Sequence, residues 1–157
     1  MHAGEWNPNR EVGVEIQKQW MRNAISVGAF RIGHGIIAHI DPDFMAELKE
    51  KDICLEICLF SNAYLDNVPD GLFSNHPLPI LHRAGVPCCL SSDDPWNMRT
   101  WNTQGLVREY EIARDKLGMS NPELAQLAQN SFKYSLAPES LKEQAYIDID
   151  NWLLQYP

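Results

Sequence analysis

Two short segments made almost entirely of apolar residues constrain the fold of this chain more than any other feature. ICLEICLF (Ile53 to Phe60) and VPCCLSS (Val86 to Ser92) lack the regular polar alternation of a strand with one solvated face. They are typical of strands buried on both faces, and AFRIGHGI (Ala29 to Ile36) is a shorter strand-like run. Because helical segments separate these strands, we expect a parallel sheet with right-handed crossovers, which is an α/β fold.

The segments between and after the strands have helical patterns. Asp41 followed by Pro42 is typical of a helix cap and first helical position. Ser120 and Glu123 have the spacing of a capping motif. The expected helices cover about 10–27, 41–52, 76–85, 102–117, 122–134 and 138–154. With 157 residues the chain is long enough for the core of one domain, so residues 1–157 are predicted to form a single domain.

Residues with reactive side chains occur where the strand-like segments end. The polar residues at these ends are His2, Glu5, His34, Ser61, Asn62, Asp93 and Asp94. The three later groups follow apolar runs, whereas the first would end a fourth strand only if its apolar part lies before Met1. Chemistry in parallel α/β sheets gathers at the carboxyl ends of the strands. We therefore expect these side chains to share one site.

The types of residue at these ends suit a metal. Adjacent carboxylates such as Asp93 and Asp94 repel each other, and a bound cation relieves that repulsion. Histidine nitrogen and carboxylate oxygen together are typical ligands of zinc and similar divalent ions. A further histidine and a glutamate would supply the base and the acid of metal-assisted hydrolysis.

Each residue also has an alternative interpretation when it is taken singly. His34 between two glycines is typical of a turn or core residue, and Glu5 of the surface. Asp93 and Asp94 before Pro95 are equally typical of a helix cap. Other histidines and tryptophans are assigned structural positions only: His39, His76 and His82 to a helix cap or the surface, and Trp96 and Trp101 to the core. Of these, His76 lies near a loop that could face the same cleft. The joint pattern favours the shared site.

Composition excludes several classes of function. A net charge of −8 disfavours a nucleic-acid partner, because few basic residues are present to displace counterions from phosphates. No apolar run reaches the 18 residues that a membrane span requires. The start of the chain lacks the pattern of a secretory signal. All four cysteines lie in apolar runs without zinc-knuckle spacing, which is typical of reduced, buried residues in a cytoplasmic protein.

The motifs HAGE, RIGHG, SN, HP and SSDDP, in this order and at these separations, resemble the second half of the adenosine/AMP deaminase family. The segment GLVREYEIA further downstream is similar to the acidic and aromatic helix that follows the aspartate pair in that family. The resemblance covers essentially the whole chain. It implies the C-terminal portion of a (β/α)8 TIM-type barrel, with about four parallel strands and additional C-terminal helices.

The resemblance also implies roles around a single zinc ion. His2 and Asp93 would be zinc ligands, and Asp93 would also contact the water that the ion activates. His34 would be the base that helps to deprotonate this water. Two protein ligands are one fewer than the usual three of a catalytic zinc site. Because the chain contains no H-x-H pair, tight zinc binding is expected to require ligands from outside these residues.

The substrate implied by the resemblance is adenosine or a related 6-aminopurine. Glu5 would share a proton with the ring nitrogen beside the attacked carbon, and Asp94 would hydrogen-bond the five-membered side of the purine. Gly4 of the same HAGE motif would lie against the substrate. The reaction would be attack of water at C6 with release of ammonia. Free adenine, a nucleotide or another adenosine derivative are open alternatives.

The missing first half of the family pattern leaves two further alternatives. The chain either works with the missing half, as part of a longer protein or by complementation, or it is an inactive truncated relic. A partial barrel would expose sheet edges, so self-association is also expected.

Overall fold

The described part of the molecule is built around one parallel sheet. The structure, a computed structural model, describes residues 1–5, 12–65, 67–68, 73–94 and 105–157. Within these residues four strands pair in the order β1-β2-β3-β4, so each strand lies beside its successor in sequence. The strands are β1 (His2–Ala3), β2 (Arg31–His34), β3 (Cys54–Ile57) and β4 (Cys88–Leu90). The expected α/β fold with about four parallel strands is confirmed.

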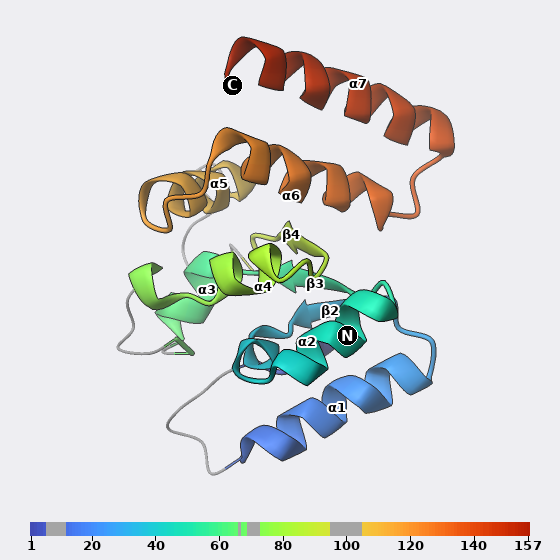
Figure 1. Ribbon diagram of the computed structural model, residues 1–157, viewed down its shortest axis with the longest axis vertical. Helices are drawn as coiled ribbons and strands as arrows, with labels where there is room; N and C mark the ends of the chain where they lie inside the picture. Colours follow the sequence, from blue (N-terminus) through green and yellow to red (C-terminus); the bar gives the residue numbers. More distant parts are fainter. Residues whose placement is uncertain (6–11, 66, 69–72, 95–104) are drawn as a thin grey trace.

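Helices connect the strands and extend beyond the last one. The α-helices are α1 (Val14–Ser26), α2 (Pro42–Glu50), α3 (Leu59–Tyr64), α4 (Leu78–Arg83), α5 (Leu106–Asp115), α6 (Asn121–Lys133) and α7 (Glu139–Gln155). In the described part of the chain, the 3-10 helices η1 (Ile36–Ile40) and η3 (Phe73–Asn75) lie within the connections. In Figure 1, α1 lies at one end of the molecule, near the N-terminus, and α6 and α7 are stacked at the other end. Helix α6 packs on β4 and α7 packs on α6, so α7 forms an outer layer.

The helix starts follow the predicted capping chemistry. Asp41 Oδ1 accepts hydrogen bonds from the backbone N–H groups of Asp43 (3.0 Å) and Phe44 (3.1 Å), and Pro42 begins α2. Ser120 and Glu123 form a reciprocal capping box at the start of α6. Side chains of this kind satisfy backbone donors that have no partner inside the helix. Both predicted caps are confirmed.

One predicted strand is too long. Ile53 to Phe60 was expected to be a single strand, but β3 ends at Ile57 and α3 begins at Leu59. The apolar run continues because the first residue of α3 is also buried, and periodicity cannot separate a buried strand from a buried helical turn. Two predicted helices extend beyond the described residues: the helix at 10–27 through residues 10–11, and the helix at 102–117 through residues 102–104.

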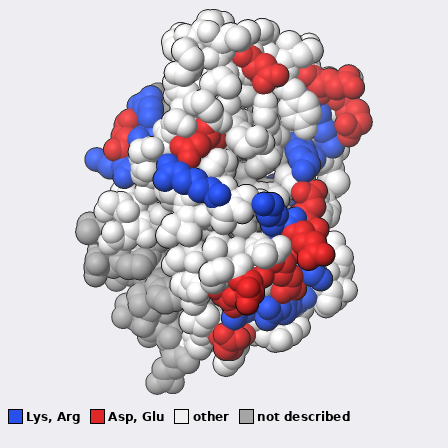
Figure 2. All heavy atoms as spheres, in the orientation of Figure 1, with Lys and Arg blue, Asp and Glu red and all other residues white. Residues whose placement is uncertain are grey.

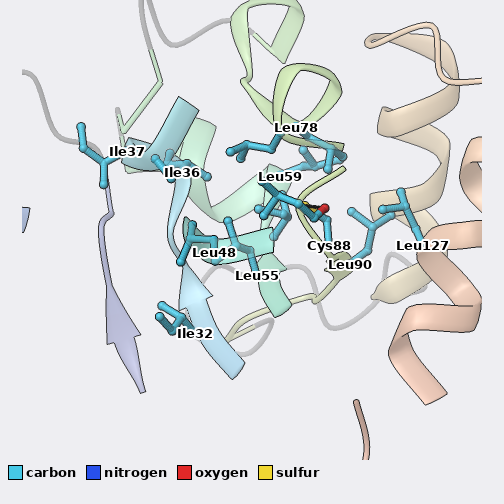
Figure 3. Packing of buried hydrophobic residues seen from close by; sticks show 14 of the residues in the cluster. Ile32, Ile36, Ile37, Leu48, Leu55, Leu59, Leu78, Cys88, Leu90 and Leu127 are labelled. Carbon is cyan, nitrogen blue, oxygen red and sulfur yellow. Dashed lines mark hydrogen bonds between the residues drawn. The ribbon is translucent and has the colours of Figure 1, made fainter. Parts of the chain in front are cut away.

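The core lies between the sheet and its covering helices. Figure 3 shows Leu55 of β3 near Ile32 of β2 and Leu48 of α2, and Leu127 of α6 directed toward Leu90 of β4. All five belong to one buried cluster. The four cysteines are buried and free, as expected. None of the helices in the described ranges has the length and apolar content needed to cross a membrane.

Charged residues of opposite sign are interspersed on the surface. On the face in Figure 2, lysine and arginine side chains lie beside aspartate and glutamate side chains. Individual pairs include Lys18 with Asp41 and Arg83 with Glu123. Mixed charge of this kind gives that face no continuous basic area for a phosphate backbone.

Candidate metal and active site

The parallel sheet brings the predicted polar residues together at the carboxyl ends of its strands. His2 lies in β1, His34 is the last residue of β2, and Asp93 follows β4. Each of the three offers one ligand atom, and these atoms lie within 4.8 Å of one another. The rings of His2 and His34 are 5.2 Å apart between centroids. Glu5 also faces this group, whereas Asp94 is exposed beside Asp93.

His34 lies at the centre of the group. Its Nε2 atom is 3.9 Å from Glu5 Oε2 and 3.9 Å from Asp93 Oδ2. Burial lowers the pKa of His34, although the two nearby carboxylates oppose that effect. The buried ring is therefore held toward its neutral form, in which one nitrogen is a donor and the other an acceptor or a metal ligand.

Two residues of the site have unusual backbone conformations. His34 has φ +67° and Asp93 has φ +55°, both in the left-handed region that residues other than glycine seldom adopt. Such conformations cost on the order of 1–3 kcal/mol each and persist where the surrounding structure enforces them, often at functional sites. Both residues contribute ligand atoms to the group at the carboxyl ends of the strands.

The carboxylates are oriented by neutral donors. Ser61 Oγ in α3 donates to Asp93 Oδ2 at 2.5 Å. Asn67 Nδ2 donates to Glu5 Oε1 at 2.5 Å, which leaves Glu5 Oε2 on the side of His34. Ser61 was expected at a strand end without a specific role, and Asn67 was not among the residues predicted from the sequence. Both residues are identified in the structure, as hydrogen-bond donors to Asp93 and Glu5.

His76 is more deeply involved than its sequence assignment suggested. It was assigned to a helix cap or the surface, but it is only 3% exposed. Its Nδ1 atom accepts from the backbone N–H of Leu78 at the start of α4, so the capping assignment is partly right. Burial lowers the pKa of His76 to about 3. Its other ring nitrogen contacts Asn62, which contacts His34.

Glu109 is a buried acid that sequence analysis did not select. It lies in α5, is 2% exposed, and its Oε2 atom accepts from the backbone N–H of Phe60 at 3.2 Å. Glu109 therefore caps α3, the helix that provides Ser61 and Asn62. Burial raises the pKa of Glu109 from an ordinary value of 4.5 to about 7. The signal in the sequence was the GLVREYE segment, but spacing did not reveal which side chain turns inward.

The raised pKa of Glu109 makes stability depend on pH. Between about pH 4.5 and 7 the unfolded chain releases this proton and the folded chain keeps it. The free energy of unfolding should therefore fall as pH rises through that window, by on the order of 3 kcal/mol. The Glu109→Gln variant should lack this fall in urea titrations from pH 4.5 to 7.5. Glu111→Gln, on the exposed side of the same helix, is the matched control; parallel curves for wild type and Glu109→Gln would contradict the prediction.

Gly4 connects β1 to Glu5 in a conformation that requires glycine. Its φ is +69°, and a Cβ atom there would overlap Met21 Sδ and lie 2.9 Å from Ile37 Cγ2. Gly4→Ala should lower the free energy of unfolding by roughly 2–4 kcal/mol, from backbone strain and overpacking combined. Chemical denaturation measures this, with Gly13→Ala as control because nothing lies within 4 Å of a Cβ atom there. Equal stability of the two variants would show that Gly4 is not under packing constraint.

The donor set at the edge of the sheet fits a zinc-like ion. Two imidazoles and one carboxylate converge within 4.8 Å, and nitrogen with carboxylate oxygen is a ligand mixture that zinc accepts. Ser61 fixes the carboxylate of Asp93, in the way that outer partners commonly orient metal ligands.

Comparison with known proteins adds a family to this geometry. Residues 1–152 match the family model described as adenosine deaminase. The chain is 37% identical over 114 residues to an adenine deaminase of Agrobacterium fabrum, a match that covers 73% of this chain and 33% of the relative. It is 37% identical over 125 residues to an adenosine deaminase of Aliivibrio fischeri, covering 78% of this chain and 35% of the relative.

A solved structure agrees with the sequence matches. The crystal structure of an adenine deaminase from Arthrobacter aurescens superposes with a TM-score of 0.81 at 29% identity, covering 97% of this chain and 42% of that one. The four-stranded parallel sheet thus corresponds to part of the (β/α)8 barrel expected from the sequence. The chain spans about a third of the length of the curated relatives that it matches. Motifs, fold and family match together show that this chain belongs to the adenosine deaminase family.

Proposed function

We propose that this chain provides the C-terminal half of a site for metal-dependent hydrolytic deamination of a 6-aminopurine, with release of ammonia. The observation that supports this most strongly is the grouping of His2, His34 and Asp93, with Glu5 beside them, at the carboxyl edge of a parallel sheet. The names of the matched relatives, adenine deaminase and adenosine deaminase, supply the substrate class.

His2 and Asp93 are the proposed protein ligands of one zinc ion. When bound, such an ion supplies a Lewis acid that makes water nucleophilic near neutral pH. Two ligands are fewer than the three typical of catalytic zinc. The proposal therefore includes further ligands from outside these 157 residues, since the chain contains no H-x-H pair.

Glu5 is the proposed proton donor to the purine. Attack of water on a ring carbon builds negative charge on the adjacent ring nitrogen, and a positioned acid neutralises that charge as it forms. The bond from Asn67 orients Glu5 through one oxygen and leaves Oε2 on the side of His34. His34 is proposed to contact the attacking water through Nε2, which faces both carboxylates.

Asp94 and Gly4 are the proposed substrate contacts. Asp94 is exposed and directly follows the proposed ligand Asp93. It is proposed to hydrogen-bond the five-membered side of the purine. Gly4 is proposed to border the substrate through its backbone, between the metal ligand His2 and the acid Glu5.

The exposed edge of the sheet supports association with a second element. Among the described residues β1 pairs only with β2. Exposed large apolar side chains line one hollow together with His2 and Ala3 of β1: Met1 (66%), Trp20 (50%) and Val27 (74%). Unpaired edges beside apolar surface are association sites. We propose that the other half of the barrel, or a second copy of the chain, covers this edge. A non-catalytic association module is the second candidate function, favoured by this same surface.

The test combines zinc analysis with turnover. The purified chain, alone and mixed with a separately produced N-terminal portion of a matched relative, is incubated with adenine, adenosine and AMP. The proposal expects zinc retention and loss of absorbance at the adenosine band, with ammonia release, at least in the mixture. Zinc-free protein without turnover in both preparations would exclude the enzyme and leave the association module.

A further inference from the structure

Three buried side chains form a hydrogen-bonded series that ends at the proposed active site. His34, Asn62 and His76 are 2%, 0% and 3% exposed, respectively. Asn62 Nδ2 lies 3.1 Å from His34 Nδ1, and His76 Nε2 lies 3.1 Å from Asn62 Oδ1. We propose that Asn62 and His76 are positioning residues that determine which ring nitrogen of His34 carries the proton.

The donor and acceptor roles along the series are fixed at His76, the end farthest from the proposed active site. The backbone N–H of Leu78 points to His76 Nδ1 at 3.1 Å, and a backbone N–H can only donate. His76 Nδ1 must therefore be the acceptor nitrogen of the ring. In the neutral ring the proton then lies on Nε2, which donates to Asn62. Burial, which lowers the pKa of His76 to about 3, keeps the ring neutral.

The donor at His76 Nε2 fixes the amide of Asn62. Only the amide oxygen can accept from that N–H, so Oδ1 faces His76 and Nδ2 faces His34. The amide N–H in turn requires an acceptor at His34 Nδ1. The neutral His34 ring must then carry its proton on Nε2, the nitrogen that faces Glu5 and Asp93.

The opposite arrangement leaves buried donors facing each other. A proton on His34 Nδ1 would face the amide N–H of Asn62, so that two donors meet. If the Asn62 amide were rotated to place its oxygen there, its N–H group would instead face the N–H at His76 Nε2. Moving the His76 proton to Nδ1 would only transfer the conflict to the N–H of Leu78. Buried donors without an acceptor are costly, so the series admits one tautomer.

This tautomer sharpens the role of His34, and that part of the inference rests on the proposed function. The ring presents an N–H, and not a lone pair, to the site. His34 is then a hydrogen-bond donor to the oxygen of the attacking water, rather than the base expected from the family resemblance. The proton that leaves this water then goes to the carboxylate of Asp93, which faces Nε2 and is not the proposed acid. A protonated Nε2 also removes His34 from the metal ligands, which leaves His2 and Asp93.

The tautomer can be measured in the metal-free chain, without turnover. Two-bond proton–nitrogen NMR spectra of the nitrogen-15-labelled chain distinguish Nδ1–H from Nε2–H, with each histidine assigned by single His→Gln variants. His34 should show a roughly tenfold or greater excess of the Nε2–H form. His39 is an internal reference, because its Nδ1 atom lies 2.6 Å from the carbonyl oxygen of Ile36 and must be protonated there. An averaged or Nδ1–H signal from His34 would overturn the proposal.

A single substitution should reverse the tautomer. In Asn62→Asp the carboxylate accepts from both histidines, so His34 should carry its proton on Nδ1. Asn23→Asp is the matched control, since it adds the same charge at an exposed position whose oxygen already accepts from Gln19. An unchanged His39 signal confirms that the variants fold. Retention of Nε2–H in folded Asn62→Asp would contradict the proposal.

A second variant covers the case in which Asn62→Asp does not fold. His76→Phe removes the donor that orients Asn62, so His34 should change from one dominant tautomer to a mixture. An unchanged His34 signal in this variant would show that His76 does not determine the tautomer of His34. All these readouts are spectroscopic and independent of zinc binding and turnover, which test the proposed function itself. A failure of the tautomer proposal can therefore be distinguished from a failure of the proposed function.

Discussion

Replacing Asp93 with alanine is expected to weaken zinc binding by roughly a hundredfold or more relative to the unchanged chain. Loss of an outer partner of a metal ligand typically costs 10–100-fold in affinity, and Asp93 is a proposed ligand itself. It is the only carboxylate in the group of three whose ligand atoms lie within 4.8 Å among the described residues. Its removal would leave His2 as the one proposed ligand among the described residues.

The neighbouring aspartate provides the matched control. Asp94→Ala removes the same group one residue away, but at an exposed position outside that group. Zinc affinity should then stay within a few-fold, as measured by competition with a chromophoric chelator. Ser61→Ala should have an intermediate effect, because it removes the donor that orients Asp93. Equal losses from Asp93→Ala and Asp94→Ala would show that the two acids have been assigned wrongly.

Replacing Glu5 with glutamine is expected to lower the rate of deamination by roughly 10²–10⁴-fold, the range typical of a lost general acid. Glutamine keeps the size of the side chain and can still accept from Asn67 through its amide oxygen. It has no proton to transfer to the ring nitrogen. The change should therefore affect the chemical step and leave the metal in place.

This effect is measured as ammonia release by the preparation that shows turnover, together with zinc affinity. Glu15→Gln, at an exposed position of α1, is the control for loss of a carboxylate. An unchanged rate in Glu5→Gln would exclude Glu5 as the acid. A parallel loss of zinc affinity would instead show that Glu5 belongs to the metal site.

Much of the fold follows from local patterns in the sequence. The apolar runs around Leu55 and Cys89 predicted buried parallel strands, and Asp41 and Ser120 predicted two helix starts. These signals are local, because burial on both faces and capping each depend on neighbouring residues. The end of β3 was misplaced for the same reason: the first turn of α3 is as apolar as the strand before it.

The members of the candidate site also follow from the sequence. Parallel strands bring their carboxyl ends to one edge, so His34 after β2 and Asp93 after β4 had to lie near one another once the strands were identified. The sequence could not predict the left-handed backbone of either residue. Histidine and aspartate adopt positive φ more often than most residues other than glycine, but the surrounding structure decides at which positions they do so.

The partners of these residues were decided by the tertiary structure alone. Asn62 meets His34 from 28 positions away, His76 meets Asn62 from 14, and Glu109 meets the backbone of Phe60 from 49. Hydrogen bonds across such separations depend on how helices settle on the sheet, which neither propensity nor spacing encodes. The sequence by itself determined which residues can do chemistry here and on which edge they gather. The packed structure decided which are buried, which donate and which accept, because those properties belong to contacts between distant segments.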